Sequence, residues 1–310
     1  MIELLLSRAG ESPPLDLTTF AWKSLGGNRY GFHHDVVKWN NQLYWIGGTN
    51  GTPQTLFARW NGTGWTALPA LPTARSGHTS VVVGDKLYVC GGQNAGGTAH
   101  TTLVQCYDFV AGTWSTKAPL PGTQCYGDGC AIGTDIYLFG GMTSQTSTPE
   151  VPSKFIQYKY DTLTDTWSEL TITGQTPRLD LGVAALEGKI YLIGGRNNSA
   201  YTNKTFCYDP ATGDMIQKAN LLASYGCRRA FVAFDKRLIS LWGCQASNGT
   251  PYTGTNWYDP VDDTWHALPA NASAARGFGG AGFIGNKIYY FSGIKTGTGQ
   301  VDAWEFSPPA

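Results

Sequence analysis

The chain has 310 residues, of which 42% are hydrophobic and only 14% are charged, and its formal net charge is zero. A balanced charge argues against nucleic acid as the main partner, because binding to phosphates needs a surplus of Lys and Arg. The sequence has no run of about 18 apolar residues, so we expect no transmembrane helix and no membrane insertion.

The chain begins with residues 1–17, which precede the first repeat and which we expect to form an arm. This segment is apolar at 2–6 and then contains Pro13 and Pro14. It does not resemble a signal peptide, because Glu3 stands where a positive charge belongs and the apolar run is short. We therefore expect synthesis in the cytoplasm. The arm is interpreted either as a packed or frayed terminus or as a segment that docks the protein on a particle or complex.

A lead-in of apolar residues that ends in Gly-Gly recurs about every fifty residues, a period typical of propeller or solenoid arrays. Four copies are clear and two are degenerate: NQLYWIGG (41–48), DKLYVCGG (85–92), TDIYLFGG (134–141), GKIYLIGG (188–195), KRLISLWGC (236–244) and NKIYYFSG (286–293). Glycine pairs at the end of a strand permit a positive φ and close approach of a neighbouring backbone. We interpret them as architecture and not as a phosphate loop, which would lead into a helix.

Each repeat predicts four strands, named a to d here in chain order. HTSVVVGDKLYVCGG indicates strand, tight turn, strand, and LVQCYDFVAGTWSTKAPLP indicates two further strands and a proline stop. A Tyr-Asp pair precedes a Trp in CYDFVAGTW, KYDTLTDTW and WYDPVDDTW, whereas Met215 takes the Trp position in CYDPATGDM. One such sheet buries little, and packing blades face to face around an axis supplies the core.

This order of strand, Gly-Gly, polar loop, Tyr-Asp, short turn and Trp resembles the kelch repeat over nearly the whole chain. The resemblance implies an all-β fold, a six-bladed β-propeller of four-stranded antiparallel blades. The departures are Gly-Cys at 243–244, Ser-Gly at 292–293 and Met215.

The two ends of the chain predict how the ring closes. VDAWEF (301–306) aligns with a third strand, and the fourth strand of that repeat is missing after it. FAWKSL (20–25) matches a fourth strand that has no repeat of its own. We therefore expect the N-terminal strand to complete the last blade, closing a propeller over 18–308 and removing an open edge.

The b–c and d–a loops are long and polar and share one face, which is the better candidate for function. Two rings of equivalent positions enter the innermost strands there. The first ring is Gly31, Arg75, Gln124, Arg178, Gly226 and Arg276, and the second ring is His33, Gly77, Tyr126, Asp180, Arg228 and Phe278. The predicted ligand-binding set is Arg29, Tyr30, His33, Arg75, Tyr126, Arg178, Asp180, Arg228, Arg276 and Phe278.

Arginine suits bidentate capture of carboxylates, and aromatic rings suit sugar faces or peptide side chains. In kelch-family adaptors, arginines at the strand-entry position contact acidic peptides. That implication extends to Arg75, Arg178 and Arg276 only. The alternative is that these arginines bind loop carbonyls and hold the blades together.

Two enzymatic alternatives follow from the resemblance. A copper radical oxidase of the galactose oxidase type needs a tyrosine–cysteine cross-link, a second tyrosine and two histidines. His34 and His78 occupy equivalent positions in adjacent blades, but no third ligand is identifiable. A sialic acid mutarotase-like activity would need an Arg and a carboxylate at the channel mouth. Arg178 with Asp180, or Arg75 with Asp128, would supply that pair.

No cofactor or metal is predicted. Seven cysteines show no CxxC pair and no zinc spacing, which favours reduced core thiols. No dense run of carboxylates supports calcium.

We interpret the chain as a non-enzymatic binding or structural propeller whose long-loop face recognises a protein or a glycan. The low charge, the arm and the missing signal favour a virion component such as a bacteriophage tail or fibre protein. The alternatives are an intracellular protein-interaction kelch module and the mutarotase-like sugar epimerase.

Overall fold

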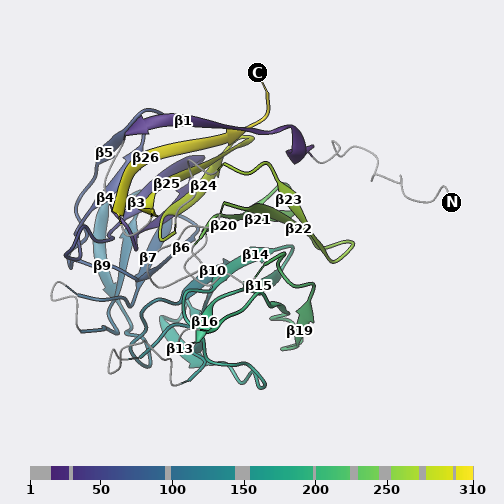
Figure 1. Cartoon of the computed structure of the whole chain (residues 1–310). Helices are drawn as coiled ribbons and strands as arrows, with labels where there is room; N and C mark the ends of the chain where they lie inside the picture. The colour runs from purple at the N-terminus through teal and green to yellow at the C-terminus, as the bar shows by residue number, and fades with distance from the viewer. Residues whose placement is uncertain are drawn as a thin grey trace.

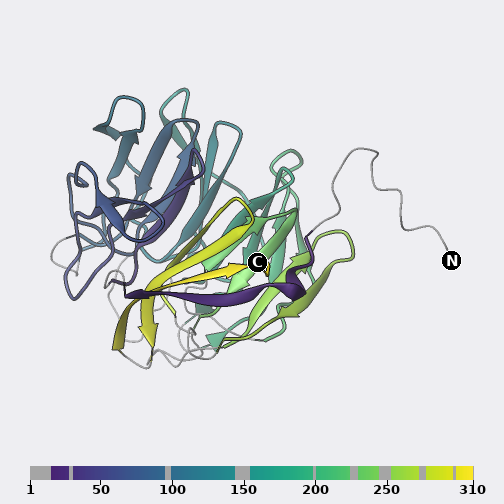
Figure 2. The ribbon, with the colours of Figure 1, turned by 90° about the horizontal axis from the view of Figure 1, so that it is seen from above.

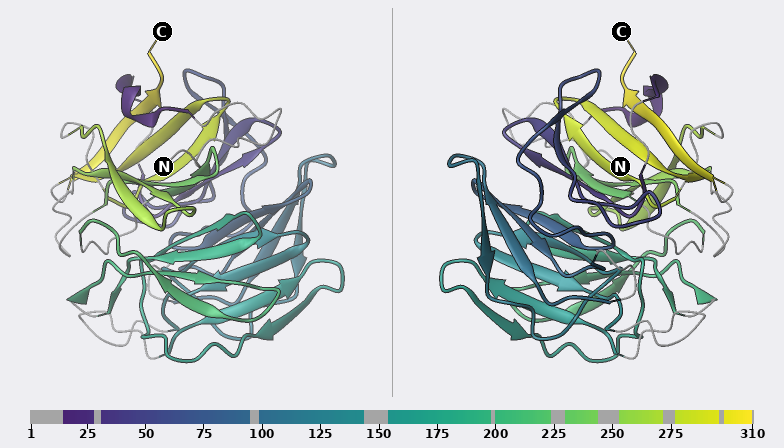
Figure 3. Two further views of the ribbon diagram at one scale, coloured as in Figure 1. Left: turned by 90° about the vertical axis from the view of Figure 1, so that its right-hand side faces the viewer. Right: turned by 90° about the vertical axis from the view of Figure 1, so that its left-hand side faces the viewer.

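The computed structural model describes residues 15–27, 31–94, 99–143, 154–197, 200–223, 230–243, 253–271, 277–295 and 298–309. Over these ranges the protein is all-β apart from one 3-10 turn, η1 (Leu17–Thr19). Six four-stranded antiparallel sheets stand around a common axis as the blades of a propeller (Figure 1). The predicted fold class is therefore confirmed. Figure 3 shows the same blades from two opposite sides.

Strand a of each blade is innermost, and strands a of neighbouring blades contact one another around the axis. Blade 1 consists of β2 (Asp35–Trp39), β3 (Gln42–Ile46), β4 (Phe57–Trp60) and β5 (Trp65–Ala67). Blade 2 consists of β6 (Thr79–Val83), β7 (Lys86–Cys90), β8 (Val104–Asp108) and β9 (Thr113–Lys117). Blade 3 consists of β10 (Asp128–Ile132), β11 (Asp135–Phe139), β12 (Gln157–Asp161) and β13 (Thr166–Glu169).

Blade 4 carries an additional two-stranded hairpin in its b–c loop. Blade 4 consists of β14 (Gly182–Leu186), β15 (Lys189–Ile193), β18 (Thr205–Tyr208) and β19 (Met215–Lys218), with the hairpin β16 (Arg196–Asn197) and β17 (Ala200–Tyr201). Blade 5 consists of β20 (Ala230–Phe234), β21 (Arg237–Leu241), β22 (Thr255–Asp259) and β23 (Thr264–Leu268). Blade 6 consists of β24 (Gly280–Ile284), β25 (Lys287–Lys295), β26 (Thr298–Ser307) and β1 (Ala21–Gly27).

The N-terminal strand completes the last blade, as the sequence predicts. β1 runs antiparallel to β26, with Trp22 opposite Phe306, and the purple and yellow strands lie side by side in Figure 2. Just before β1, the backbone N–H of Leu15 donates to Asp235 Oδ2 at 2.7 Å. Leu17 is buried against blades 5 and 6. Residues 15–17 of the expected arm therefore pack on the propeller, and residues 1–14 lie outside the described residues.

Tryptophans at the start of strand d join neighbouring blades. In four blades the indole Nε1–H donates to a carbonyl that follows strand d of the preceding blade. These pairs are Trp114 to Pro69 (2.9 Å), Trp167 to Ala118 (2.9 Å), Trp265 to Ala219 (3.1 Å) and Trp22 to Pro269 (3.0 Å). Met215 cannot donate such a bond, so blade 4 lacks this link to blade 3. The repeated Trp is thus a contact between blades and not a surface feature.

The glycine pairs form a second contact between blades. Gly91 and Gly92 have φ of 63° and 92°, and the Gly92 N–H donates to Gln124 O of the next blade at 2.7 Å. A Cβ at Gly91 would lie 2.4 Å from Gln124 O of the next blade, and a Cβ at Gly92 would lie 2.8 Å from Ser76 O of its own blade. The same bond recurs in blades 1, 3 and 6, from Gly48 to Arg75, Gly141 to Arg178 and Gly293 to Gly31. The last of these bonds joins blade 6 to blade 1.

In blade 5 the residues at the two glycine positions lie one residue earlier than the sequence predicts. Strand β21 ends at Leu241, so Trp242 and Gly243 occupy the two glycine positions, with φ of 40° and 138°. The Gly-Cys pairing at 243–244 was wrong by one residue. Trp242 is fully buried, and its ring packs 4.3 Å from that of Trp22, which explains how a large side chain is accommodated there.

Candidate functional site

The channel mouth on the long-loop face is framed by a ring of backbone hydrogen bonds. Four of the five described second-ring residues donate their backbone N–H to the carbonyl of the equivalent residue in the preceding blade. The bonds run from His33 to Phe278 (2.9 Å), Gly77 to His33 (3.0 Å), Tyr126 to Gly77 (2.9 Å) and Asp180 to Tyr126 (2.9 Å). All five residues have left-handed φ, between 56° and 63°. Non-glycine residues in this conformation carry strain, which proteins concentrate at functional sites.

Three aromatic side chains meet at this mouth, from blades 1, 3 and 6. The His33 ring lies edge-on to Tyr126 at 5.2 Å and beside Phe278 at 4.7 Å. Gly77 leaves room for this arrangement, because a Cβ there would lie 2.7 Å from the Tyr126 ring. The Tyr126 hydroxyl donates to Gln93 Oε1 at 3.0 Å, which holds the ring in place. We call His33, Tyr126 and Phe278 the aromatic mouth.

Asp180, the fourth described member of this ring with a side chain, is committed within its own blade. Its Oδ2 accepts a hydrogen bond from Arg196 Nε at 2.8 Å, and the side chain is almost completely buried. The sequence suggested Arg178 as its partner, but Arg178 binds elsewhere. The pair required for the mutarotase-like alternative is therefore not assembled from these two residues.

The described first-ring side chains, those of Arg75, Gln124 and Arg178, point into the blades and not into the mouth. Arg75 is 0% exposed and donates to Gly91 O at 2.7 Å and to Leu103 O at 3.1 Å. Arg178 is also buried and donates to Gly194 O at 3.2 Å, with its guanidinium over the Phe206 ring. Burial lowers the pKa of both guanidinium groups to about 10, so both stay charged at neutral pH.

The three described side chains of the first ring share one contact: each donates to the carbonyl of the first glycine of its own blade. Gln124 makes this contact too, because its Nε2 donates to Gly140 O at 2.9 Å. Blade 1 has Gly31 at this position, and there the Trp45 indole donates to Gly47 O at 2.9 Å instead. Direct ligand contact by Arg75 and Arg178, as predicted, does not fit this geometry, since their guanidinium groups are buried on carbonyls. The remaining predicted residues, Arg29, Tyr30, Arg228 and Arg276, lie outside the described residues.

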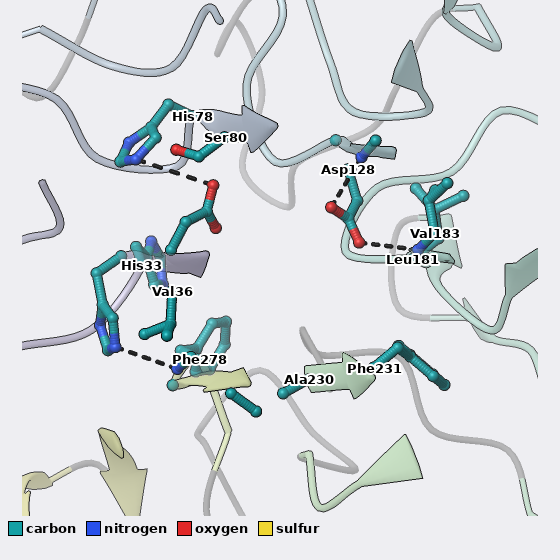
Figure 4. Close-up of a pocket in the computed structure, with 17 residues that line it drawn as sticks. His33, Val36, His78, Ser80, Asp128, Leu181, Val183, Ala230, Phe231 and Phe278 are labelled. Carbon is teal, nitrogen blue, oxygen red and sulfur yellow. Dashed lines mark hydrogen bonds and ion pairs between the residues drawn. The ribbon is translucent and has the colours of Figure 1, made fainter. Parts of the chain in front are cut away.

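Below the aromatic mouth lies a cavity of about 180 Å³ on the propeller axis (Figure 4). Described residues of all six blades line it, and two of them are carboxylates. Asp128 accepts hydrogen bonds from the backbone N–H groups of Gly129 and Val183, both at 2.8 Å. Asp35 Oδ2 lies 3.9 Å from His78 Nε2. The cavity is therefore polar, with negative charge held in fixed positions.

Sequence reasoning missed Asp35 and considered Asp128 only as a partner of Arg75. Both are the first residue of an innermost strand, in blades 1 and 3. That shared register was the available signal. Arg75 is withdrawn into blade 2, so it does not pair with Asp128 as the second mutarotase arrangement requires.

His34 is part of the packing between blades 6 and 1. Its ring stacks on Trp45 at 3.6 Å, and its Nε2 accepts the Gly280 N–H at 3.1 Å. Burial lowers the pKa of His34 to about 3, so the ring is neutral. Among the residues that the structure describes, no three His, Cys, Asp or Glu side chains are grouped to hold a metal ion. Within the same ranges, no helix has the length and apolarity to cross a membrane.

Comparison with known proteins identifies related chains. The family model of the KLHDC2/KLHL20/DRC7 Kelch-repeats domain matches residues 77–293. Kelch-like protein 35 of Mus musculus is 29% identical over 204 residues, which cover 63% of this chain and 33% of that protein. N-(sulfonatooxy)prop-2-enimidothioate sulfolyase of Thlaspi arvense is 26% identical over 225 residues, 63% of this chain and 62% of that protein. The match thus spans less than two-thirds of either relative.

A solved structure titled "Structure of YjhT" superposes with a TM-score of 0.76, covering 88% of this chain and 94% of that one at 16% sequence identity. At this identity the likeness concerns the fold alone.

Proposed function

The chain belongs to the kelch-repeat family, and from that premise we propose that it is a non-enzymatic protein-interaction module that binds its partner through the aromatic mouth. The observation that carries this proposal is the ring of left-handed residues around the mouth. It holds His33, Tyr126 and Phe278 on a rigid frame, on the face from which the long loops leave. Rigid aromatic side chains supply contact area at low entropic cost, and they dominate binding energy at protein interfaces.

The kelch-like relatives favour the intracellular protein-interaction alternative over the virion interpretation. We therefore propose that the protein acts inside the cell. Assembly into a virion, with docking of the N-terminal arm on a particle, rests on the sequence alone. A glycan ligand is supported by the same aromatic rings, because sugar faces stack on them.

The mutarotase-like alternative has lost both of its proposed residue pairs. The sulfolyase among the relatives shows that an enzyme can share part of this sequence pattern. We propose binding without catalysis for this chain. N-acetylneuraminate anomers that equilibrate faster with the protein than without it, as followed by NMR, would contradict that proposal.

A displayed library of random peptides tests the proposed function. Peptides selected on the wild-type protein should lose most of their affinity for Phe278→Ala, because truncating a central aromatic anchor typically costs about 2 kcal/mol or more. Val261→Ala is the matched control, since Val261 is 90% exposed on a c–d turn of the opposite face. Peptides that bind both variants equally well, or a protein that selects no peptide and instead binds a glycan array, would overturn it.

A further inference from the structure

Blade 1 has a pocket of about 380 Å³ beside its first-ring residue, Gly31. In blades 2 and 4 the first-ring residues are Arg75 and Arg178, whereas in blade 1 the glycine has no side chain to fill this space. The described residues that line the pocket are all uncharged: Gly31, Trp45, Gly47, Thr49, Asn50, Gln54, Thr55 and Leu56. We call this the blade 1 pocket.

Blades 2 and 4 show which chemical group this part of a blade holds. In blade 2 the Arg75 guanidinium donates to Gly91 O, to Leu103 O and to Gln105 Oε1, the last at 3.1 Å. In blade 4 the Arg178 guanidinium donates to Gly194 O and, at 3.1 Å, to Gln175 Oε1. In both blades, backbone carbonyls and one glutamine oxygen therefore bind a guanidinium group, and no carboxylate takes part in these bonds.

The blade 1 pocket offers equivalent acceptors. The Gly47 N–H donates to Leu56 O at 2.7 Å, just as the Gly91 N–H donates to Leu103 O at 3.1 Å. A carbonyl oxygen has two acceptor sites, and Leu103 O uses its second site for Arg75. Within the described part of the chain, Leu56 O accepts only the bond from Gly47. Gln54 supplies an amide oxygen, since its printed side-chain bonds all come from Nε2.

Trp45 explains why residue 31 does not supply the guanidinium itself. A Cβ at Gly31 would lie 2.8 Å from Trp45 Cζ2. The indole ring cannot move aside easily, because it donates to Gly47 O at 2.9 Å and stacks on His34 at 3.6 Å. The ring thus requires glycine at position 31 and forms a fixed wall of the pocket.

We propose that the blade 1 pocket binds an arginine side chain of the partner protein, whose guanidinium group donates to Leu56 O and to Gln54 Oε1. This inference rests on the proposed function and deepens it, because the arginine belongs to a protein bound at the aromatic mouth. Two residues of chain span at most about 7 Å, so Gly31 lies within that distance of His33. A partner that contacts His33 therefore reaches the pocket with one long side chain. The planar fork of donors on arginine suits separate acceptors better than the compact ammonium group of lysine.

The first test follows backbone amide signals by NMR while methylguanidinium is added at millimolar concentration, with methylammonium at equal concentration as reference. We expect methylguanidinium to shift the Gly47 amide signal, because Leu56 O gains a second donor, and methylammonium to shift it much less. The Gly91 amide is the internal control, since Leu103 O already accepts from Arg75. Equal shifts at Gly47 and Gly91, equal shifts with both cations, or no shift at Gly47 would overturn the inference.

Variants at an exposed position separate the pocket from a general attraction of cations. Thr55 is exposed and lines the pocket, so Thr55→Arg should abolish the Gly47 shift. Thr63→Arg places the same charge on the exposed c–d turn of blade 1 and should leave the shift unchanged. Arg29 lies outside the described residues, two positions before Gly31. A Gly47 shift that appears only in Arg29→Ala would assign the pocket to this chain's own arginine and overturn the role of the partner.

The second test uses peptides selected from the library on the wild-type protein. Replacing their arginine by norleucine, or using Thr55→Arg, should each weaken Kd about 10- to 100-fold, the range for hydrogen bonds to a charged group. Thr63→Arg should leave Kd unchanged. Peptides that depend on Phe278 but bind equally with norleucine, or that contain no arginine, would overturn the inference and leave the proposed function intact. Peptides that ignore Phe278 would contradict the proposed function itself.

Discussion

Replacement of Gly92 by alanine is expected to weaken the contact between blades 2 and 3. Its φ of 92° already disfavours any side chain, at a cost of about 1–2 kcal/mol. The added Cβ would lie 2.8 Å from Ser76 O and 2.9 Å from His78 N, both rigid backbone atoms. Overpacking of this kind costs about 1–3 kcal/mol, and displacement of the Gly92 bond to Gln124 O costs about 1 kcal/mol more. Gly92→Ala should therefore lower the unfolding free energy by about 3–6 kcal/mol.

Gly84→Ala is the matched control in the same blade. Gly84 also has a positive φ, of 56°, but no atom lies within 4 Å of the position that its Cβ would take, so only the backbone strain of about 1 kcal/mol applies. Urea unfolding, followed by tryptophan fluorescence, gives both free energies from midpoint and slope. Equal losses in the two variants would refute the conclusion that Gly92 provides the space needed by the backbone of Ser76 and His78.

Three further predictions concern side chains whose polar groups bind within or between the blades. The wild-type protein should lose about 2 kcal/mol of stability between pH 7 and pH 5, and His34→Gln should not show this loss. The pKa of His34 is about 3 in the folded protein and about 6.5 in the unfolded chain, so the unfolded state binds the proton first and stability falls as the pH falls below about 6.5. Parallel pH profiles of wild type and variant, measured by urea unfolding, would contradict this. Trp167→Phe should lose about 1 kcal/mol, because the ring still packs on Tyr160 while the bond to Ala118 O is gone; a calorimetric Tm that does not change would refute the link. Arg75→Met should lower Tm clearly while leaving peptide affinity intact, and lost affinity at unchanged Tm would restore Arg75 as a ligand residue.

The fold was predictable because each repeat encodes the same local constraints. A strand that ends in Gly-Gly, followed by Tyr-Asp and Trp, specifies left-handed backbone and a bond between blades, and both recur along the chain. The missing fourth strand of the last repeat predicted closure by β1. The pair in blade 5 was misplaced because Trp242 occupies the first glycine position. Gly243, which occupies the second, was therefore taken as the start of the pair.

The site was harder to predict because a sequence position fixes a Cα and not the end of a long side chain. Arg75 enters the structure at the mouth, but its stem carries the guanidinium inward to Gly91 O. Gly91, which supplies that carbonyl, has a left-handed φ of 63°. Asp35 was missed for the opposite reason: a single Asp at the start of a strand is common, and only the assembled ring brings it into one cavity with Asp128.

The most direct test of the proposed mouth is photo-crosslinking of a library-selected peptide. A photoreactive benzoyl-phenylalanine is placed at position 278 in one protein and at position 261 in another, so that the two faces of the propeller are compared. We expect the peptide to crosslink at position 278 and not at position 261, and excess unlabelled peptide to abolish the product. Crosslinking at position 261 alone, or equally at both positions, would contradict recognition through the aromatic mouth.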